Sequence, residues 1–134
     1  MSPATARRRK RRPNQPPPSA LTERRFLFVC SQNKLRSPTA EQIFADWPGI
    51  EVSSAGTNRD AENPLTDEFV EWADAIFVME RAHVDKVRSK FRRALGSTRI
   101  VCLDIPDEYE FMEPDLVRLL RARMRRHLST GTVE

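Results

Sequence analysis

The segment from Arg25 to Glu41 constrains the fold of this chain more than any other part of the sequence. It begins with the apolar run Phe26–Val29, which ends in Cys30, and a short polar loop then leads to Arg36, six positions after the cysteine. A helical pattern follows. The apolar run predicts a buried strand, and the polar loop predicts a tight connection into a helix. Backbone N–H groups at such a junction, together with the helix dipole, favour a bound anion.

The sequence after this segment continues to alternate between short apolar runs and helical patterns. The predicted strands are Phe26–Cys30, Ile50–Ser54, Ala75–Met79 and Ile100–Leu103. The predicted helices are Ser37–Asp46, Thr66–Trp72, Arg81–Leu95 and Pro114–Leu128, with Thr66 as an N-cap and Gly96 as a helix end. This alternation predicts an α/β fold of three αβα layers around a four-stranded parallel sheet. Ligands of such sheets bind at the carboxyl ends of the strands, where Cys30 lies.

Positive charge is concentrated in the N-terminal tail. Of the 134 residues, the first 20 include six basic residues and no acidic one, although the whole chain has a formal net charge of +4. The remainder therefore carries 17 basic residues against 19 acidic ones. We expect residues 1–22 to be a disordered, basic, proline-rich tail, and residues 23–134 to form one domain. The tail is expected to be a solvated extension, with contact to nucleic acid or an anionic surface as the alternative.

The composition points to a cytoplasmic protein without a metal or cofactor. Two cysteines are too few for a disulfide framework, and no apolar run approaches the roughly 20 residues of a membrane helix. The N-terminus also lacks the apolar stretch of a secretory signal. His83 and His127 fall on predicted helices without partners at metal-ligand spacing, so both are expected at the surface. Cys102 falls in an apolar strand and is expected to be buried.

The spacing of Cys30 and Arg36 is suited to a tetrahedral oxyanion. The loop would donate the backbone amides of Ser31, Gln32, Asn33, Lys34, Leu35 and Arg36, and the Arg36 guanidinium would bind two oxygens. This positive environment favours the thiolate of Cys30, to which Ser37 can donate a hydrogen bond. The natural reaction is attack on phosphorus, giving a cysteinyl-phosphate that water hydrolyses. A general acid is then needed to protonate the leaving oxygen.

Four segments, in order, resemble the motifs of the low-molecular-weight protein tyrosine phosphatases. They are Val29-Cys30-x-x-Asn33-x-x-Arg36-Ser37-Pro38-x-Ala40-Glu41, Ser53–Thr57, Ala73–Glu80 and Asp104–Asp107. The resemblance covers about residues 25–128. It implies a phosphate-binding loop between the first strand and the first helix, and a cysteine-dependent phosphomonoesterase. The implied substrate is a phosphotyrosine protein or a small aryl phosphate.

The resemblance also implies a role for each matching residue. Cys30 would be the nucleophile and Arg36 the group that binds the transition state, while Ser37 would stabilise the thiolate. Asn33 would hold the loop in shape, itself with a positive φ. Asp107 would be the general acid. The remaining matches are Asp104, which competes with Asp107 for that role, and Tyr109, an aromatic residue that would line the pocket.

Three residues depart from the family pattern. Gln32 stands where the family usually has glycine, and Leu35 where it often has a second cysteine. Without that cysteine, the nucleophile lacks a local disulfide partner against over-oxidation. Glu108 replaces the proline that usually follows the acid. The segment between Thr57 and Asp74 is also about one helix shorter than is typical, which reduces the wall that would recognise a substrate.

Two other functions are compatible with such a loop. An arsenate reductase would use the same cysteine, but it needs resolving thiols, and Cys102 is the only other cysteine here. An external thiol would be its remaining route. The second alternative is a non-catalytic phosphate-binding module, and the departures at Gln32 and Glu108 are compatible with it.

Overall fold

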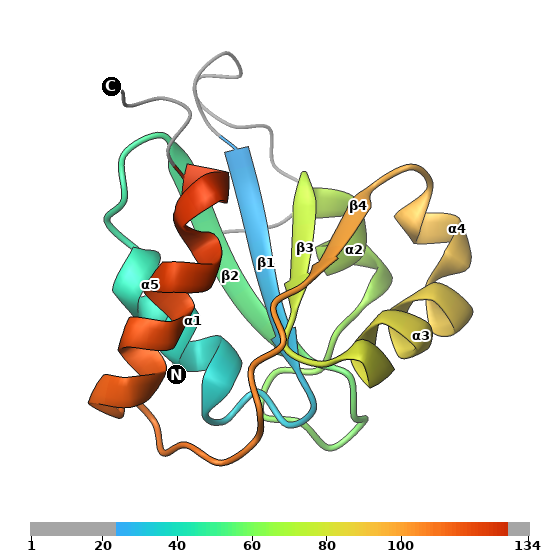
Figure 1. Cartoon of the computed structure of the whole chain (residues 1–134). Coiled ribbons are helices and arrows are strands. Elements are labelled where there is room, and N and C mark those ends of the chain that lie inside the picture. Colours follow the sequence, from blue (N-terminus) through green and yellow to red (C-terminus); the bar gives the residue numbers. More distant parts are fainter. Residues whose placement is uncertain (1–23, 129–134) are drawn as a thin grey trace.

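The computed structural model describes residues 24–128, which form four strands and five helices (Figure 1). The strands are β1 (Arg24–Cys30), β2 (Ile50–Gly56), β3 (Ala75–Val78) and β4 (Arg99–Cys102). The helices are α1 (Arg36–Phe44), α2 (Asp67–Trp72), α3 (Arg81–Lys90), α4 (Arg92–Leu95) and α5 (Pro114–Leu128). The predicted tail, residues 1–22, lies outside the described residues.

The strands form one parallel sheet in the order β2-β1-β3-β4. Helices α1 and α5 cover one face, and α2, α3 and α4 cover the other (Figure 1). Each face has its own apolar core, because alternate β1 side chains point to opposite sides: Phe26 and Phe28 to one, Leu27 and Val29 to the other. The predicted three-layer αβα fold is confirmed. Because β1 is an inner strand, Cys30, its last residue, lies in the middle of the edge formed by the carboxyl ends of the strands.

The predicted third helix is divided in two. Helix α3 ends at Lys90, and Phe91 has φ −123° and ψ 33°, outside the helical region, before the single turn α4 begins. The Phe91 side chain is partly buried and packs against the apolar core on the α2, α3 and α4 side of the sheet. We attribute the break between α3 and α4 to this packing. The other predicted elements are present with ends that differ by up to two residues, and two predicted helix-end residues are confirmed. Thr66 caps α2 by accepting a hydrogen bond from the Phe69 N–H at 3.3 Å, and Gly96 with φ 52° ends α4.

Two side chains differ from the sequence prediction in their burial. Cys102 is only partly buried, because β4 is the edge strand of the sheet, and its Sγ donates to Asp104 Oδ1 at 3.5 Å. His127 is partly buried rather than on the open surface. Its ring packs edge-on against Phe77, with 5.0 Å between ring centroids. Both predictions were wrong because the exposed fractions of these side chains depend on the order of the strands and on the packing of α5. Neither can be predicted from residues close in the sequence.

Within residues 24–128, no helix combines the length and the apolar character needed to cross a membrane.

Candidate active site

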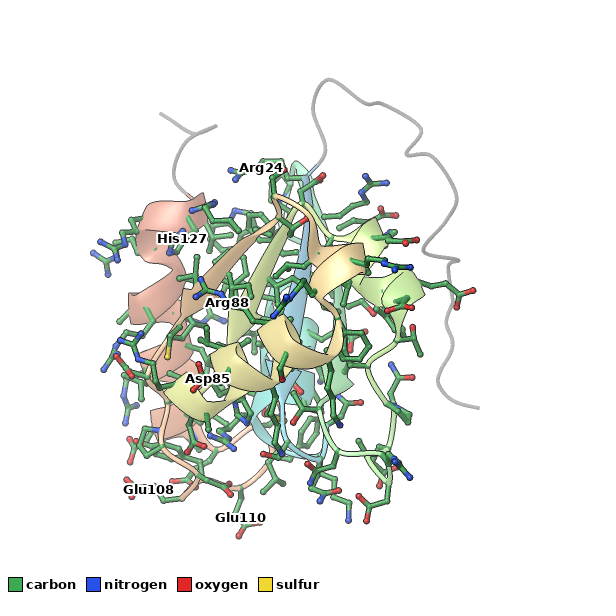
Figure 2. The ribbon with its side chains drawn as sticks, turned by 90° about the vertical axis from the view of Figure 1, so that its right-hand side faces the viewer. Arg24, Asp85, Arg88, Glu108, Glu110 and His127 are labelled. Carbon is green, nitrogen blue, oxygen red and sulfur yellow. The ribbon has the colours of Figure 1, made fainter. Side chains whose placement is uncertain are left out.

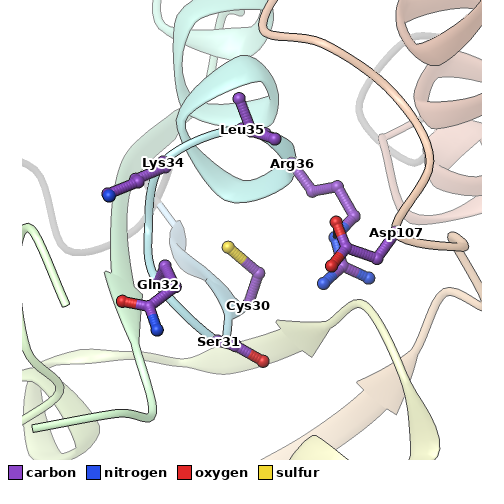
Figure 3. Close-up of a pocket in the computed structure, with 7 residues that line it drawn as sticks. All are labelled: Cys30, Ser31, Gln32, Lys34, Leu35, Arg36 and Asp107. Carbon is purple, nitrogen blue, oxygen red and sulfur yellow. Dashed lines mark ion pairs between the residues drawn. The ribbon is translucent and has the colours of Figure 1, made fainter. Parts of the chain in front are cut away.

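The loop from Ser31 to Leu35 joins β1 to α1 and curves around the Cys30 sulfur (Figure 3). The carbonyl oxygens of Cys30, Ser31 and Gln32 accept hydrogen bonds of 2.9–3.0 Å from the backbone N–H groups of Thr57, Asn58 and Glu62, respectively. The C=O and N–H of a trans peptide point in opposite directions, so the N–H groups of these same peptides point away from the segment that binds their carbonyls. The segment after β2 thus holds the loop in a conformation that can receive a tetrahedral oxyanion.

A chain of buried polar groups lies behind the nucleophile. Cys30 Sγ is 3.0 Å from Ser37 Oγ. Asn33 Nδ2 donates to Ser37 Oγ at 2.9 Å and to Ser54 Oγ at 3.0 Å. When Cys30 is a thiolate, the Ser37 hydroxyl can donate to the sulfur, which is nearer than its other acceptor, Ala55 O at 3.5 Å. Asn33 has φ 58°, so the predicted positive φ is confirmed.

The Arg36 side chain is held in place by contacts within the protein. It is 3% exposed, and its Nη1 donates to Ile105 O at 2.8 Å and lies 3.1 Å from Glu80 Oε2. Its Nε lies 3.8 Å from Asp107 Oδ1. Figure 3 shows Asp107 beside the guanidinium. Anchoring through Nη1 fixes the guanidinium plane, and a fixed plane is what recognition of two oxyanion oxygens requires.

Asp107 is carried by the loop of residues 103–112, which follows β4. On one side Arg123 Nη1, from α5, donates to Leu103 O at 2.7 Å. On the other side Met112 N donates to Thr39 Oγ1, on α1, at 2.9 Å. The Asp107 side chain itself is 65% exposed. The loop is therefore held at both ends, while the Asp107 side chain between them stays largely exposed.

The pocket above Cys30 has a volume of about 110 Å³. It is lined by Cys30, Ser31, Gln32, Lys34, Leu35, Arg36 and Asp107, all of which were predicted site residues. Asn33 and Ser37 are buried beneath the loop rather than in the pocket. No cluster of three or more His, Cys, Asp or Glu side chains suited to a metal ion is present in the described part of the chain.

Asp104 and Tyr109 are not among the residues that line this pocket. Asp104 lies just after β4 with φ 55°, and its carboxylate accepts the bond from Cys102. Tyr109 is partly buried against the core on the α1 and α5 side of the sheet. Of the two aspartates, Asp107 alone therefore lines the pocket, and Tyr109 makes a packing contact instead.

Gly56 ends β2 directly beside the loop, paired with Cys30. A Cβ at this position would lie 2.6 Å from Ser31 O, 2.6 Å from Ala61 Cβ and 3.0 Å from Asn33 N. Two of these contacts are with the backbone of the phosphate-binding loop. A glycine is required here because only its missing side chain allows β2 and the loop to approach so closely.

We expect Gly56→Ala to damage both stability and phosphate binding. The added methyl group must displace either the loop or the Ala61 segment, and overpacking of this kind typically costs about 1–3 kcal/mol. Urea unfolding and titration with inorganic phosphate would measure the two effects. Gly96→Ala is the matched control for phosphate binding, since nothing lies within 4 Å of a Cβ at Gly96. Unchanged phosphate affinity in Gly56→Ala would contradict the prediction.

His83 is the functional candidate that sequence reasoning missed. It was expected at the surface, yet it is 2% exposed and its Nε2 lies 2.9 Å from Ser31 Oγ in the loop. Burial, the largest cause, acts together with the nearby Arg36 guanidinium to lower the pKa of His83 from 6.5 to about 4. The spacing of Glu80 and His83 was the available signal, because these residues form a capping box at the start of α3.

The depressed pKa of His83 makes the fold less stable in acid. Between pH 6.5 and about 4 the unfolded chain binds a proton at this residue and the native chain does not. Stability must therefore fall as the pH drops through this window, by at most about 1.4 kcal/mol per pH unit. The free energy of unfolding, measured with urea from pH 7.5 to 4.5, should fall more steeply in the wild type than in His83→Gln. Parallel curves for the two proteins would show that His83 does not titrate in this way.

The comparisons with known proteins agree with this geometry. No family model matches the chain. The protein-arginine phosphatase of Geobacillus stearothermophilus is 28% identical over 98 residues, and the match covers 55% of this chain and 66% of that relative, slightly under two thirds. The tyrosine phosphatase Wzb from Escherichia coli K30, solved with phosphate, has a TM-score of 0.63 at 20% identity, over 78% of this chain and 95% of Wzb. The YwlE arginine phosphatase from Geobacillus stearothermophilus has a TM-score of 0.64 at 24% identity, over 81% of this chain and 94% of YwlE.

The parallel sheet and the loop between β1 and α1 give this chain the fold of these solved phosphatases. This is the architecture of the low-molecular-weight protein tyrosine phosphatases, and the resemblance predicted from the motifs is confirmed. Of these similar proteins, Wzb is named a tyrosine phosphatase and YwlE an arginine phosphatase.

Proposed function

We propose that this protein is a cysteine-dependent phosphomonoesterase that acts through a cysteinyl-phosphate intermediate. One observation carries the proposal: the Cys30 sulfur lies in a pocket with Arg36 and Asp107 on its wall, and Ser37 Oγ lies 3.0 Å behind it. This arrangement provides a nucleophile, an oxyanion-binding cation and a carboxyl group within one small pocket. A non-catalytic binding module would need neither the sulfur nor the acid there.

The proposed reaction has two steps. In the first, the Cys30 thiolate attacks phosphorus, so that an S–P bond forms while the P–O bond to the leaving group breaks. Asp107 gives its proton to the leaving oxygen, and Arg36 and the loop amides bind the oxygens of the transferring group. In the second step the Asp107 carboxylate takes a proton from water, which attacks phosphorus. The S–P bond breaks, and inorganic phosphate and the thiolate are released.

The proposed substrate is a phosphotyrosine protein or a small aryl phosphate, with phosphoarginine as the competing class. The pocket is small and open, so it would bind the phosphoryl group and leave most of the substrate outside. Gln32, Lys34 and Leu35 line it and would meet the rest of the substrate. A reducing compartment, the cytoplasm, suits this chemistry, because both Cys30 and Cys102 are free thiols and the nucleophile must stay reduced.

The test compares four reactions of the full-length protein. They are hydrolysis of p-nitrophenyl phosphate, dephosphorylation of a phosphotyrosine peptide, dephosphorylation of a phosphoarginine peptide, and arsenate reduction coupled to an external thiol. Turnover of the first two substrates is expected. Preference for the phosphoarginine peptide would keep the cysteinyl-phosphate intermediate, but the bond broken would be P–N, Asp107 would protonate a leaving nitrogen, and the substrate class would change. Arsenate turnover without phosphatase activity would replace the proposed function.

A further inference from the structure

The start of α3 contacts both ends of the phosphate-binding loop. Glu80, the N-cap of this helix, pairs with Arg36 at the end of the loop at 3.1 Å. His83, in the first turn, meets Ser31 at the beginning of the loop at 2.9 Å. Asp85 and Arg88, further along α3, lie on its exposed outer side (Figure 2). The first turn of α3 therefore contacts the site, while Asp85 and Arg88 face away from it.

Hydrogen bonding determines which nitrogen of His83 carries the proton. The Glu80 backbone N–H donates to His83 Nδ1 at 3.0 Å, so Nδ1 must be the acceptor. In the neutral ring the hydrogen is then on Nε2, and Nε2 donates to Ser31 Oγ. The direction of the whole chain, from the Glu80 amide through the imidazole to the Ser31 hydroxyl, is thus fixed.

The surroundings of His83 keep it in this neutral form. Arg36 and Lys86 oppose a positive charge on the ring, while Glu80 and Asp107 favour one. Burial is the largest influence, and with it the pKa falls to about 4. At neutral pH His83 is therefore neither a cation for phosphate nor a proton donor to a leaving group. What it supplies is one partly buried hydrogen bond to the loop.

We propose that His83 is a positioning residue that holds Ser31, and through it the first amides of the phosphate-binding loop, in the conformation that binds an oxyanion. The segment after β2 holds the outer carbonyls of the loop, but the Ser31 side chain is tied to α3. Without this hydrogen bond, the first peptides of the loop would have more conformational entropy in the free protein, and phosphate binding would have to reduce it. The inference rests on the proposed function only for its kinetic readout, because phosphate binding can be measured without turnover.

The experiment measures the Kd for inorganic phosphate by calorimetry in a set of variants. His83→Phe keeps a ring but removes both hydrogen bonds of the imidazole, and loss of the one to Ser31 should raise the Kd about 10-fold. His83→Gln retains a donor and should recover part of the affinity. Ser31→Ala should resemble His83→Phe, and the double variant should be little worse than either single one. With p-nitrophenyl phosphate, KM should rise in parallel with the Kd.

Val87→Ala is the matched control for a purely structural effect. Val87 is fully buried on the same helix but packs in the apolar core rather than against the loop. It should lower thermal stability and leave the Kd for phosphate unchanged. If His83→Phe or His83→Gln behaved like Val87→Ala, or if the Ser31 and His83 effects were fully additive, the inference would be overturned.

Further readouts separate this inference from the proposed function. A wild-type protein that binds phosphate without hydrolysing any phosphomonoester would refute the function and leave the role of His83 to be decided by the Kd values. A wild type that binds no phosphate would refute both. Nitrogen NMR of the His83 ring should show a proton on Nε2 at neutral pH, and a proton on Nδ1 would contradict the proposed direction of the hydrogen bonds.

Discussion

Cys30→Ser is expected to lower the turnover of p-nitrophenyl phosphate by about 10⁴-fold or more, because a serine hydroxyl at neutral pH is a far weaker nucleophile than a thiolate. The loop amides and Arg36 are unaffected by the change, so the variant should still bind inorganic phosphate. Loss of turnover with retained binding would separate the chemical role of the sulfur from the recognition of the anion. Steady-state kinetics and calorimetry on the same preparation measure both.

Cys102→Ser provides the control for this experiment. Cys102 is the other free cysteine, lies on the edge strand β4 and does not line the pocket. Its replacement should leave turnover close to that of the wild type. Unchanged turnover in Cys30→Ser would rule out the cysteinyl-phosphate mechanism, and loss of turnover in both variants would point to thiol chemistry that uses the two cysteines together.

Asp107→Asn should lower turnover by about 10²–10⁴-fold, the usual contribution of a general acid. The loss should depend on the leaving group. It should be larger for phenyl phosphate than for p-nitrophenyl phosphate, because nitrophenolate leaves readily without a proton. Asp107 lines the pocket 3.8 Å from Arg36 Nε, so it is placed to meet the leaving oxygen of a bound phosphate ester. Rates with the two esters, measured for both proteins, test this directly.

Asp104→Asn is the matched control, since it makes the same change of charge three residues earlier. Asp104 lies outside the pocket and accepts a hydrogen bond from Cys102, so its replacement should leave the leaving-group dependence unchanged. The opposite result, with Asp104→Asn impaired and Asp107→Asn active, would reassign the general acid. Equal losses with both esters would instead indicate a charge effect on the loop rather than proton transfer.

Local patterns predicted the features of this chain that depend on neighbouring residues. Thr66 caps α2 because its hydroxyl reaches an N–H three residues away, and Asn33 accepts a left-handed φ because its side chain tolerates one. The break at Phe91 could not be predicted in the same way. It depends on how one aromatic side chain packs against a distant core.

The sequence by itself determined the strand, loop and helix around Cys30, and with them the six-residue spacing between a sulfur and a guanidinium. It did so because these features follow from residues close together in the chain. Only the tertiary structure decided which carboxylates meet Arg36, and that His83 is buried against Ser31, 52 residues away. Those contacts exist because parallel strands bring the loops at their carboxyl ends to one edge of the sheet, and the order of the strands decides which loops become neighbours.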